Sequence, residues 1–99
     1  MAVDSACRWW VYVLNCRGNR LYTGIAKDVM ARFSQHQTGK GARFTRAFPP
    51  EQLLAAAPFP DHSTALREER RIKALTRQEK LLLVRRWQSD FPLLDTSNT

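Results

Sequence analysis

Two short stretches decide the fold of this 99-residue chain: Trp9-Trp10-Val11-Tyr12-Val13-Leu14 and Leu21-Tyr22-Thr23-Gly24. Both are rich in β-branched and aromatic residues, which is typical of strands. The segment between them, Arg17-Gly18-Asn19-Arg20, is a turn signal. We therefore predict a β-hairpin that carries one tyrosine in each strand.

The length of the hairpin loop decides whether the two tyrosines share a face, because a register change of one residue turns side chains to the other face. A two-residue loop at Gly18-Asn19 would place Tyr12 and Tyr22 on opposite faces. A three-residue loop over residues 17–19 would place Tyr22 opposite Leu14 and diagonal to Tyr12. Asn19 tolerates the left-handed backbone that this longer loop needs. The residues alone leave both alternatives open.

The composition indicates one folded domain with an anionic partner. A hydrophobic content of 43% is ordinary for a globular protein, whereas a net charge of +7 and a pI of about 10.3 favour nucleic acid or a membrane surface. The basic residues are spread over several segments, so the membrane alternative is the weaker one. We expect a lead-in at residues 1–8, one domain at 9–88 and a tail at 89–99.

The cysteines and the N-terminal residues favour a cytoplasmic protein. Cys7 and Cys16 form neither a metal-binding spacing nor a disulfide framework. The chain begins without the features of a signal peptide, and no apolar run is long enough to cross a bilayer. No obligatory protein partner is evident.

Capping residues and periodicity predict one further strand and three helices. Asp28 and Gly39 bound a helix over about residues 29–38, and Thr76 with Glu79 forms a capping box for a helix that ends near Trp87. Leu81, Leu82, Val84 and Trp87 give this last helix its predicted packing face. The remaining elements are a strand over 53–57, a helix over about 64–75 that Asp61-His62-Ser63 can cap, and a flexible basic segment over 39–46.

Three polar residues occupy unusual places on the predicted helices. Arg32 and His36 lie one turn apart beside the buried stripe of their helix, and Glu69 projects from the middle of an apolar face. A carboxylate in that position is costly unless it is paired, hydrogen-bonded or bound to a metal. One interpretation is structural: Arg32 and His36 flank the core, and Glu69 pairs with Arg32 or a neighbour.

The alternative interpretation is chemical. A carboxylate can hold a divalent cation, an arginine can neutralise phosphoryl charge, and tyrosine or histidine can move protons, so the set suits hydrolysis of phosphodiesters. In order and spacing these residues resemble the GIY-YIG nuclease family. The first signature corresponds to Trp10-Val11-Tyr12 and the second to Tyr22-Thr23-Gly24, with Trp10 in place of the glycine. The family's helix arginine, histidine and glutamate fall on Arg32, His36 and Glu69.

The resemblance extends from about residue 9 to residue 87 and is greatest to small stand-alone bacterial members related to the nuclease domain of the excinuclease C subunit. It implies an α+β fold, a small three-stranded antiparallel sheet flanked by helices in the order β-β-α-β-α-α. Both signature tyrosines face the site in this family, which selects the three-residue loop. Some relatives carry a lysine where Ile25 stands here, and Lys27 is the nearest substitute.

The implied activity is a one-metal hydrolysis of DNA. The basic charge supplies affinity without reading bases, so we expect low sequence specificity. An exposed Phe44 with basic neighbours would suit single-stranded or branched DNA, and duplex DNA stays an open alternative. Glu69 would hold Mg²⁺ or Mn²⁺, Tyr12 or Tyr22 would deprotonate or orient the water, Arg32 would stabilise the transition state, and His36 would assist proton transfer. The alternative function is a non-catalytic nucleic-acid-binding module that keeps the fold. The residues predicted to bind the nucleic acid are Lys27, Lys40, Arg43, Phe44, Arg46 and Lys73.

Overall fold

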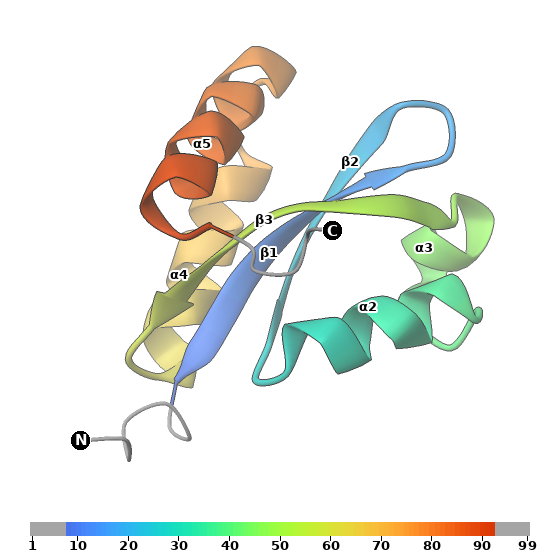
Figure 1. The fold of residues 1–99 in the computed structure, drawn as a ribbon, viewed down its shortest axis with the longest axis horizontal. Coiled ribbons are helices and arrows are strands. Elements are labelled where there is room, and N and C mark those ends of the chain that lie inside the picture. The colour runs from blue at the N-terminus through green and yellow to red at the C-terminus, as the bar shows by residue number, and fades with distance from the viewer. Residues whose placement is uncertain (1–7, 93–99) are drawn as a thin grey trace.

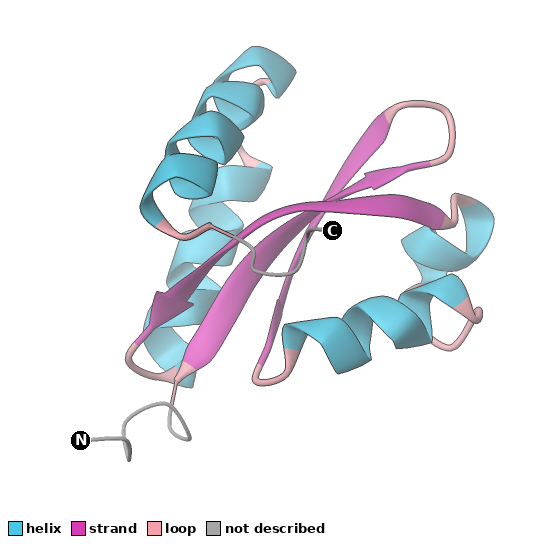
Figure 2. Cartoon of the chain, in the orientation of Figure 1, coloured by secondary structure: helices cyan, strands magenta, loops and turns pink. Residues whose placement is uncertain are grey.

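The structure, a computed structural model, describes residues 8–92, which form a three-stranded antiparallel sheet with helices on both faces (Figure 1; Figure 2). The strands lie side by side in the order β2-β1-β3, so β1 is central. The predicted α+β class and the antiparallel sheet are confirmed. The elements are β1 (Trp9–Cys16), β2 (Arg20–Ala26), α2 (Val29–Gln37), α3 (Arg43–Ala47), β3 (Pro50–Phe59), α4 (His62–Lys73) and α5 (Arg77–Asp90).

The hairpin between β1 and β2 has the three-residue loop. Cys16 pairs with Arg20, which leaves residues 17–19 as the loop. Gly18 and Asn19 both have positive φ, at 78° and 59°, and Asn19 thus has the left-handed backbone expected for the longer loop. In this register Leu14 lies opposite Tyr22. The two tyrosines therefore share one face of the sheet.

The alternating side chains of the central strand divide the core into two layers. Val11 and Val13 point to the face covered by α4 and α5, where they pack with Ile72 and Trp87. Tyr12 and Leu14 and their neighbours point to the face covered by α2 and α3. Figure 1 shows these two pairs of helices on opposite sides of the sheet. The tyrosine face is therefore the face of α2 and α3.

The predicted helix caps are present. Asp28 accepts a hydrogen bond from the Ala31 amide at the start of α2, and Asp61 accepts one from the Thr64 amide at the start of α4. The capping box at the start of α5 is complete in both directions. Among residues 8–92, no helix is long and apolar enough to cross a membrane.

Two features of the helices differ from the sequence-based expectation. The basic segment after α2 is not a flexible loop throughout, because residues 43–47 form α3, which changes the order to β-β-α-α-β-α-α. Helix α5 packs through Leu83, Val84 and Trp87, whereas Leu82 is 64% exposed. Leu81 is 38% exposed.

Helix α5 extends beyond Trp87, near which it was expected to end. It continues through residues 89 and 90, which were expected to belong to the tail, and ends at Asp90. Phe91 beyond it is 37% exposed. The predictions for residues 1–7 and 93–99 lie outside the described residues.

Candidate active site

A buried chain of hydrogen bonds connects β1 with α2 and α3. The Tyr12 hydroxyl lies 2.9 Å from His36 Nε2, and His36 Nδ1 lies 2.6 Å from Thr45 Oγ1. The Thr45 hydroxyl donates to the Ala42 carbonyl at 2.9 Å, so it is free to accept from His36 Nδ1. This assigns the proton of neutral His36 to Nδ1 and makes Nε2 the acceptor for the Tyr12 hydroxyl.

Burial keeps the phenol of Tyr12 and the imidazole of His36 uncharged. Tyr12 is 1% exposed and His36 is completely buried. Desolvation raises the pKa of Tyr12 to about 12, and the nearby charge of Tyr22 acts in the same direction. Desolvation, followed by the charge of Arg32, lowers the pKa of His36 below its usual 6.5. Near neutral pH, therefore, Tyr12 keeps its proton and His36 is neutral.

Two glycines leave the room that these rings occupy. A Cβ atom added to Gly24 would lie 2.5 Å from the Tyr12 hydroxyl oxygen, and one added to Gly41 would lie 2.1 Å from His36 Nδ1. Gly24 belongs to the second signature and Gly41 to the basic segment over 39–46, but the sequence pattern did not indicate that Gly41 faces His36. Thr45 was also missed, because an isolated threonine in a basic segment carries no signal of its own.

Gly41→Ala is expected to destabilise the protein by about 1–3 kcal/mol, the usual cost of overpacking a filled site. His36 cannot move away without losing its bonds to Tyr12 and Thr45. For a domain of this size, thermal denaturation should show a decrease in Tm of several degrees. In a His36→Ala background the same substitution should cost much less, because the clashing ring is gone. An equal cost in both backgrounds would contradict the assignment.

Tyr22 is the more accessible of the two tyrosines. Its ring is half-buried and stacks on Phe44 with centroids 5.6 Å apart and planes 26° apart. It lies 5.3 Å from the His36 ring and 6.4 Å from the Tyr12 ring. On its other side the Lys73 ammonium group is 5.7 Å from the ring centroid. Tyr22 thus lies between the buried hydrogen-bonded residues and the charged groups of α4.

Arg32 lies at the border between this core and solvent. It is half-buried on α2, and its guanidinium donates to Gln35 Oε1 at 2.9 Å. Its charge lowers the pKa of both Tyr12 and His36, although burial outweighs it for the tyrosine. A guanidinium near Tyr12 and His36 and at the border with solvent is able to bind phosphoryl oxygens.

Glu69 reaches the site from α4 and is paired. Its side chain is 13% exposed, and Oε2 lies 3.1 Å from Lys73 Nζ. The charge of Glu69 also contributes to the raised pKa of Tyr12, and its partner Lys73 places Nζ 5.7 Å from the centroid of the Tyr22 ring. The predicted pairing with a neighbour is therefore present, and the neighbour is Lys73, not Arg32. Lys73 itself is 50% exposed, so this pair can exchange partners at little cost.

Glu69 fits a divalent cation whose other ligands come from outside the protein. No group of three or more potential metal ligands is found within residues 8–92, so the protein alone does not supply a complete set of ligands around Glu69. Mg²⁺ in nucleotide-processing sites commonly uses one or two carboxylates, water and substrate phosphates. Glu69 fits that pattern, with the remaining ligands coming from substrate and solvent.

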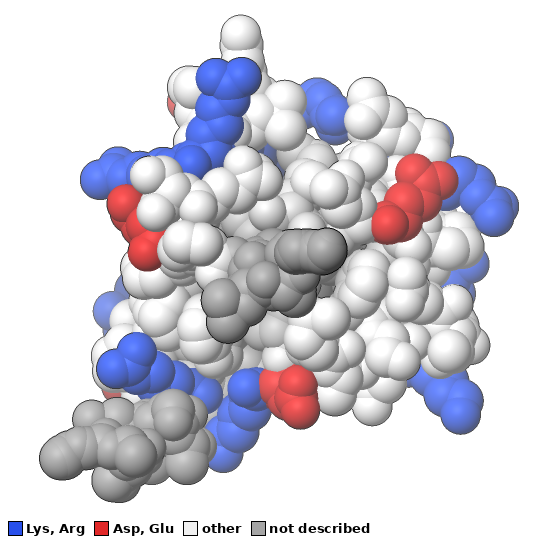
Figure 3. All heavy atoms as spheres, in the orientation of Figure 1, with Lys and Arg blue, Asp and Glu red and all other residues white. Residues whose placement is uncertain are grey.

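The other predicted nucleic-acid contacts are dispersed. Lys27 lies 5.6 Å from the Trp9 ring, whereas Lys73 lies 5.7 Å from the Tyr22 ring. Phe44 is half-buried between Tyr22 and Phe48 instead of exposed. On the face shown in Figure 3, basic groups lie mainly along the outline and are separated by uncharged surface. The three remaining residues, Lys40, Arg43 and Arg46, are exposed on α3 and the segment before it.

Comparison with known proteins adds independent information. Residues 8–81 match the model of the family described as the GIY-YIG catalytic domain. The chain is 50% identical to a UPF0213 protein of Cronobacter sakazakii over 77% of this chain and 80% of the relative. It is 46% identical to the UPF0213 protein YhbQ of Escherichia coli over 77% of this chain and 76% of the relative.

One solved structure is similar in both sequence and fold. It is the solution NMR structure of the UPF0213 protein BH0048 from Bacillus halodurans, which is 40% identical to this chain. The alignment covers 79% of this chain and 83% of that one, with a TM-score of 0.51.

Proposed function

This chain belongs to the GIY-YIG nuclease domain family, and from that premise we propose that it is a divalent-metal-dependent endonuclease that hydrolyses DNA with low sequence specificity. The names of these relatives state no activity, so the proposal depends on the geometry of this site. The observation that carries it is the meeting of five side chains from four elements. These are Tyr12, Tyr22, Arg32, His36 and Glu69.

Exposure separates the roles of the two tyrosines. A group that takes a proton from a reacting water has to touch that water, and Tyr12 is almost completely buried. Tyr22 is partly exposed and lies beside the Lys73–Glu69 pair. We therefore assign contact with the attacking water to the Tyr22 hydroxyl.

Tyr12, His36 and Thr45 act as positioning residues in this proposal. Their hydrogen bonds fix the imidazole against the sheet, and His36 in turn supports one side of the Tyr22 ring. His36 can influence proton transfer only through Tyr12, because it has no exposed surface. This arrangement holds the Tyr22 ring between His36 and Phe44 before substrate arrives.

Helices α2 and α4 bring charged side chains of opposite sign to the site. Arg32 on α2 would neutralise the phosphoryl oxygens, and Glu69 on α4 would hold Mg²⁺ or Mn²⁺. When bound, such a cation supplies Lewis-acid stabilisation of the phosphoryl and leaving oxygens. Lys73 would then be released from Glu69 and become available for a phosphate of the substrate.

The spread of the exposed cations over several elements supports low specificity. Cations on several elements attract the phosphate backbone, which carries no sequence information. Cys16 is a free, buried thiol, and this suits the reducing cytoplasm where we propose that the protein acts.

The test is a cleavage survey of the whole protein. Labelled single-stranded, duplex and branched DNA and a matched RNA are incubated with Mg²⁺, with Mn²⁺ and with EDTA. We expect cleavage of DNA only with a metal present, at positions that change little with sequence. Gel analysis identifies the products and ranks the substrates.

The survey also separates the two candidate functions. Salt-dependent binding of DNA without cleavage under any metal condition would reject the nuclease and support the binding module. Cleavage that persists undiminished in EDTA would reject the role of the metal.

A further inference from the structure

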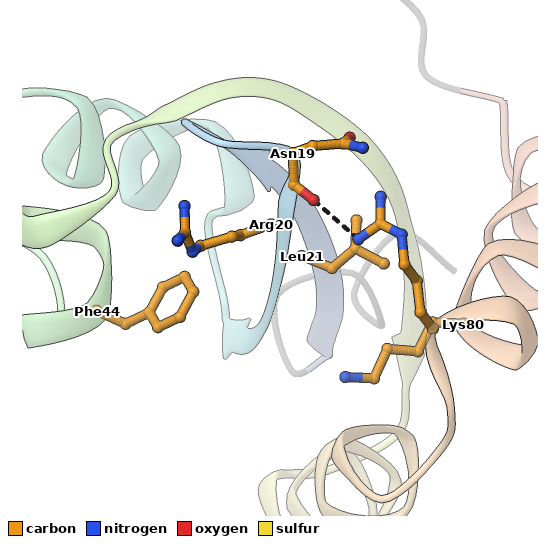
Figure 4. A pocket seen from close by; sticks show the side chains of 6 residues that line it. Asn19, Arg20, Leu21, Phe44 and Lys80 are labelled. Carbon is orange, nitrogen blue, oxygen red and sulfur yellow. Dashed lines mark hydrogen bonds between the residues drawn. The ribbon is translucent and has the colours of Figure 1, made fainter.

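A cationic pocket lies at the tip of the hairpin, outside the group of residues described above. Its volume is about 310 Å³, near the lower end for small-ligand sites. Figure 4 shows Arg20 and Phe44 on one side of the hollow and the Lys80 ammonium group extending towards it from the other. The lining residues are Asn19, Arg20, Leu21, Phe44, Arg77 and Lys80.

The chemistry of this lining favours an anion with an apolar part. Arg20, Arg77 and Lys80 are cations, and none of the six lining residues is acidic. Phe44 and Leu21 supply apolar surface between them. A phosphate with an attached sugar or base matches this combination, because the cations meet the phosphate and the aromatic ring meets the organic part.

Two of the cations are held in place by the fold. The Arg77 guanidinium donates to the Asn19 carbonyl at 2.8 Å, which fixes the start of α5 to the hairpin loop. The Arg20 guanidinium lies 3.9 Å from the centre of the Phe48 ring. Holding these groups before binding lowers the entropy cost of ordering them around a ligand. The pocket is thus formed jointly by the hairpin, α3 and α5.

Phe44 connects the pocket to the candidate active site. Its ring lines the pocket and also stacks on Tyr22. Lys73, Arg77 and Lys80 succeed one another from the end of α4 into α5, with Lys73 beside Glu69 and the other two at the pocket. A chain of cations therefore leads from the carboxylate to the pocket along β2, an outer strand of the sheet.

We propose that this pocket binds the phosphate of a nucleotide next to the cleaved bond, with Arg20, Arg77 and Lys80 as its ligands. The inference rests on the proposed function, which identifies the bound molecule as a DNA strand. It adds a neighbouring subsite to the candidate active site. It assigns to the hairpin loop and α5 a role in holding the substrate in register with Tyr22 and Glu69.

The first test measures binding without cleavage. The probe is a fluorescein-labelled single-stranded oligonucleotide of about 12 nucleotides in EDTA, a length within the usual range for single-strand sites. Fluorescence anisotropy at several salt concentrations is recorded for wild type, Lys80→Gln and the double variant Lys80→Gln with Arg20→Gln. The double variant Arg67→Gln with Arg86→Gln is the matched control, because it removes the same charge from exposed positions on α4 and α5.

The proposal predicts a several-fold loss of affinity for the pocket variants and a much smaller loss for the control. The slope of log affinity against log salt should become less steep by about 0.7 for each phosphate contact removed. Equal losses in the pocket and control variants would overturn the proposal, because they would show a general effect of net charge. Thermal denaturation checks folding, and Lys80→Gln alone provides the comparison if the double variant is unstable.

A mononucleotide distinguishes a strand subsite from a site for free nucleotides. We expect a nucleoside monophosphate to compete only weakly for wild type. Binding of the monophosphate as tight as that of the oligonucleotide, lost in the pocket variants, would overturn the assignment to a strand.

Cleavage kinetics then separate this proposal from the proposed function. If wild type cleaves DNA, the pocket variants should raise KM more than they lower kcat, and an unchanged KM would overturn the subsite. If wild type binds but does not cleave, the nuclease assignment fails, while a selective loss of binding in the pocket variants would still support the phosphate site.

Discussion

Glu69→Gln is expected to reduce DNA cleavage by about 10³-fold or more while leaving DNA binding intact or slightly stronger. The substitution removes the carboxylate that would hold the metal, and the metal contributes several kcal/mol to stabilisation of the transition state. It also removes a negative charge from a surface that meets phosphate. Initial rates with Mg²⁺ and anisotropy in EDTA measure the two effects separately.

Glu68→Gln is the matched control for this prediction. Glu68 precedes Glu69 on α4 and forms an ion pair with the exposed Arg71. The two substitutions change the net charge equally, and each breaks a partly exposed pair worth about 0–1 kcal/mol. Similar activity losses in the two variants would show that charge on α4 matters and that Glu69 holds no metal.

Tyr22→Phe is expected to lower kcat by about 10²-fold or more without a large change in stability. The missing hydroxyl is the group assigned to the water, and acid–base groups commonly contribute factors of this size. The phenyl ring preserves the stack on Phe44, so Tm should remain close to that of wild type. Cleavage reactions stopped at fixed times measure kcat, and thermal denaturation of the same preparations measures Tm.

Tyr12→Phe should show the opposite balance. It leaves the buried Nε2 of His36 without its donor, which costs about 1–3 kcal/mol and should lower Tm. The activity that remains in the folded fraction should exceed that of Tyr22→Phe. An inactive Tyr12→Phe protein with normal Tm, together with an active Tyr22→Phe protein, would reverse the two roles.

The helix starts and the hairpin strands of this protein can be predicted from residues that are close together in the sequence. Asp28, Asp61 and the Thr76–Glu79 box mark helix starts because each satisfies backbone amides near its own position in the chain. The hairpin strands were equally clear. The register was not, because both loop lengths are compatible with Gly18-Asn19 and tertiary packing of Tyr22 against α3 decides between them.

The features that were missed depend on contacts between distant segments. Helix α3 begins at Arg43 after an N-cap residue, Ala42, whose side chain forms no hydrogen bond, and Phe44 and Phe48 pack it against the sheet. For the same reason the partner of His36 could not be found from spacing, since Thr45 reaches it across a turn. On α5, Leu82 and Leu83 are equally apolar, and only the position of the sheet decides which is buried.

The pairing of Glu69 with Lys73 has a consequence for the speed of encounter with DNA. A bare carboxylate at the centre of the site would repel an approaching phosphate, whereas the neighbouring ammonium group cancels that repulsion until contact. The net charge of +7 can then attract the polyanion over a distance of about a Debye length without local opposition. If Glu69 has the proposed role, this acid would therefore cost little in association rate, because Lys73 would neutralise it until a cation and the substrate phosphate take over the two partners.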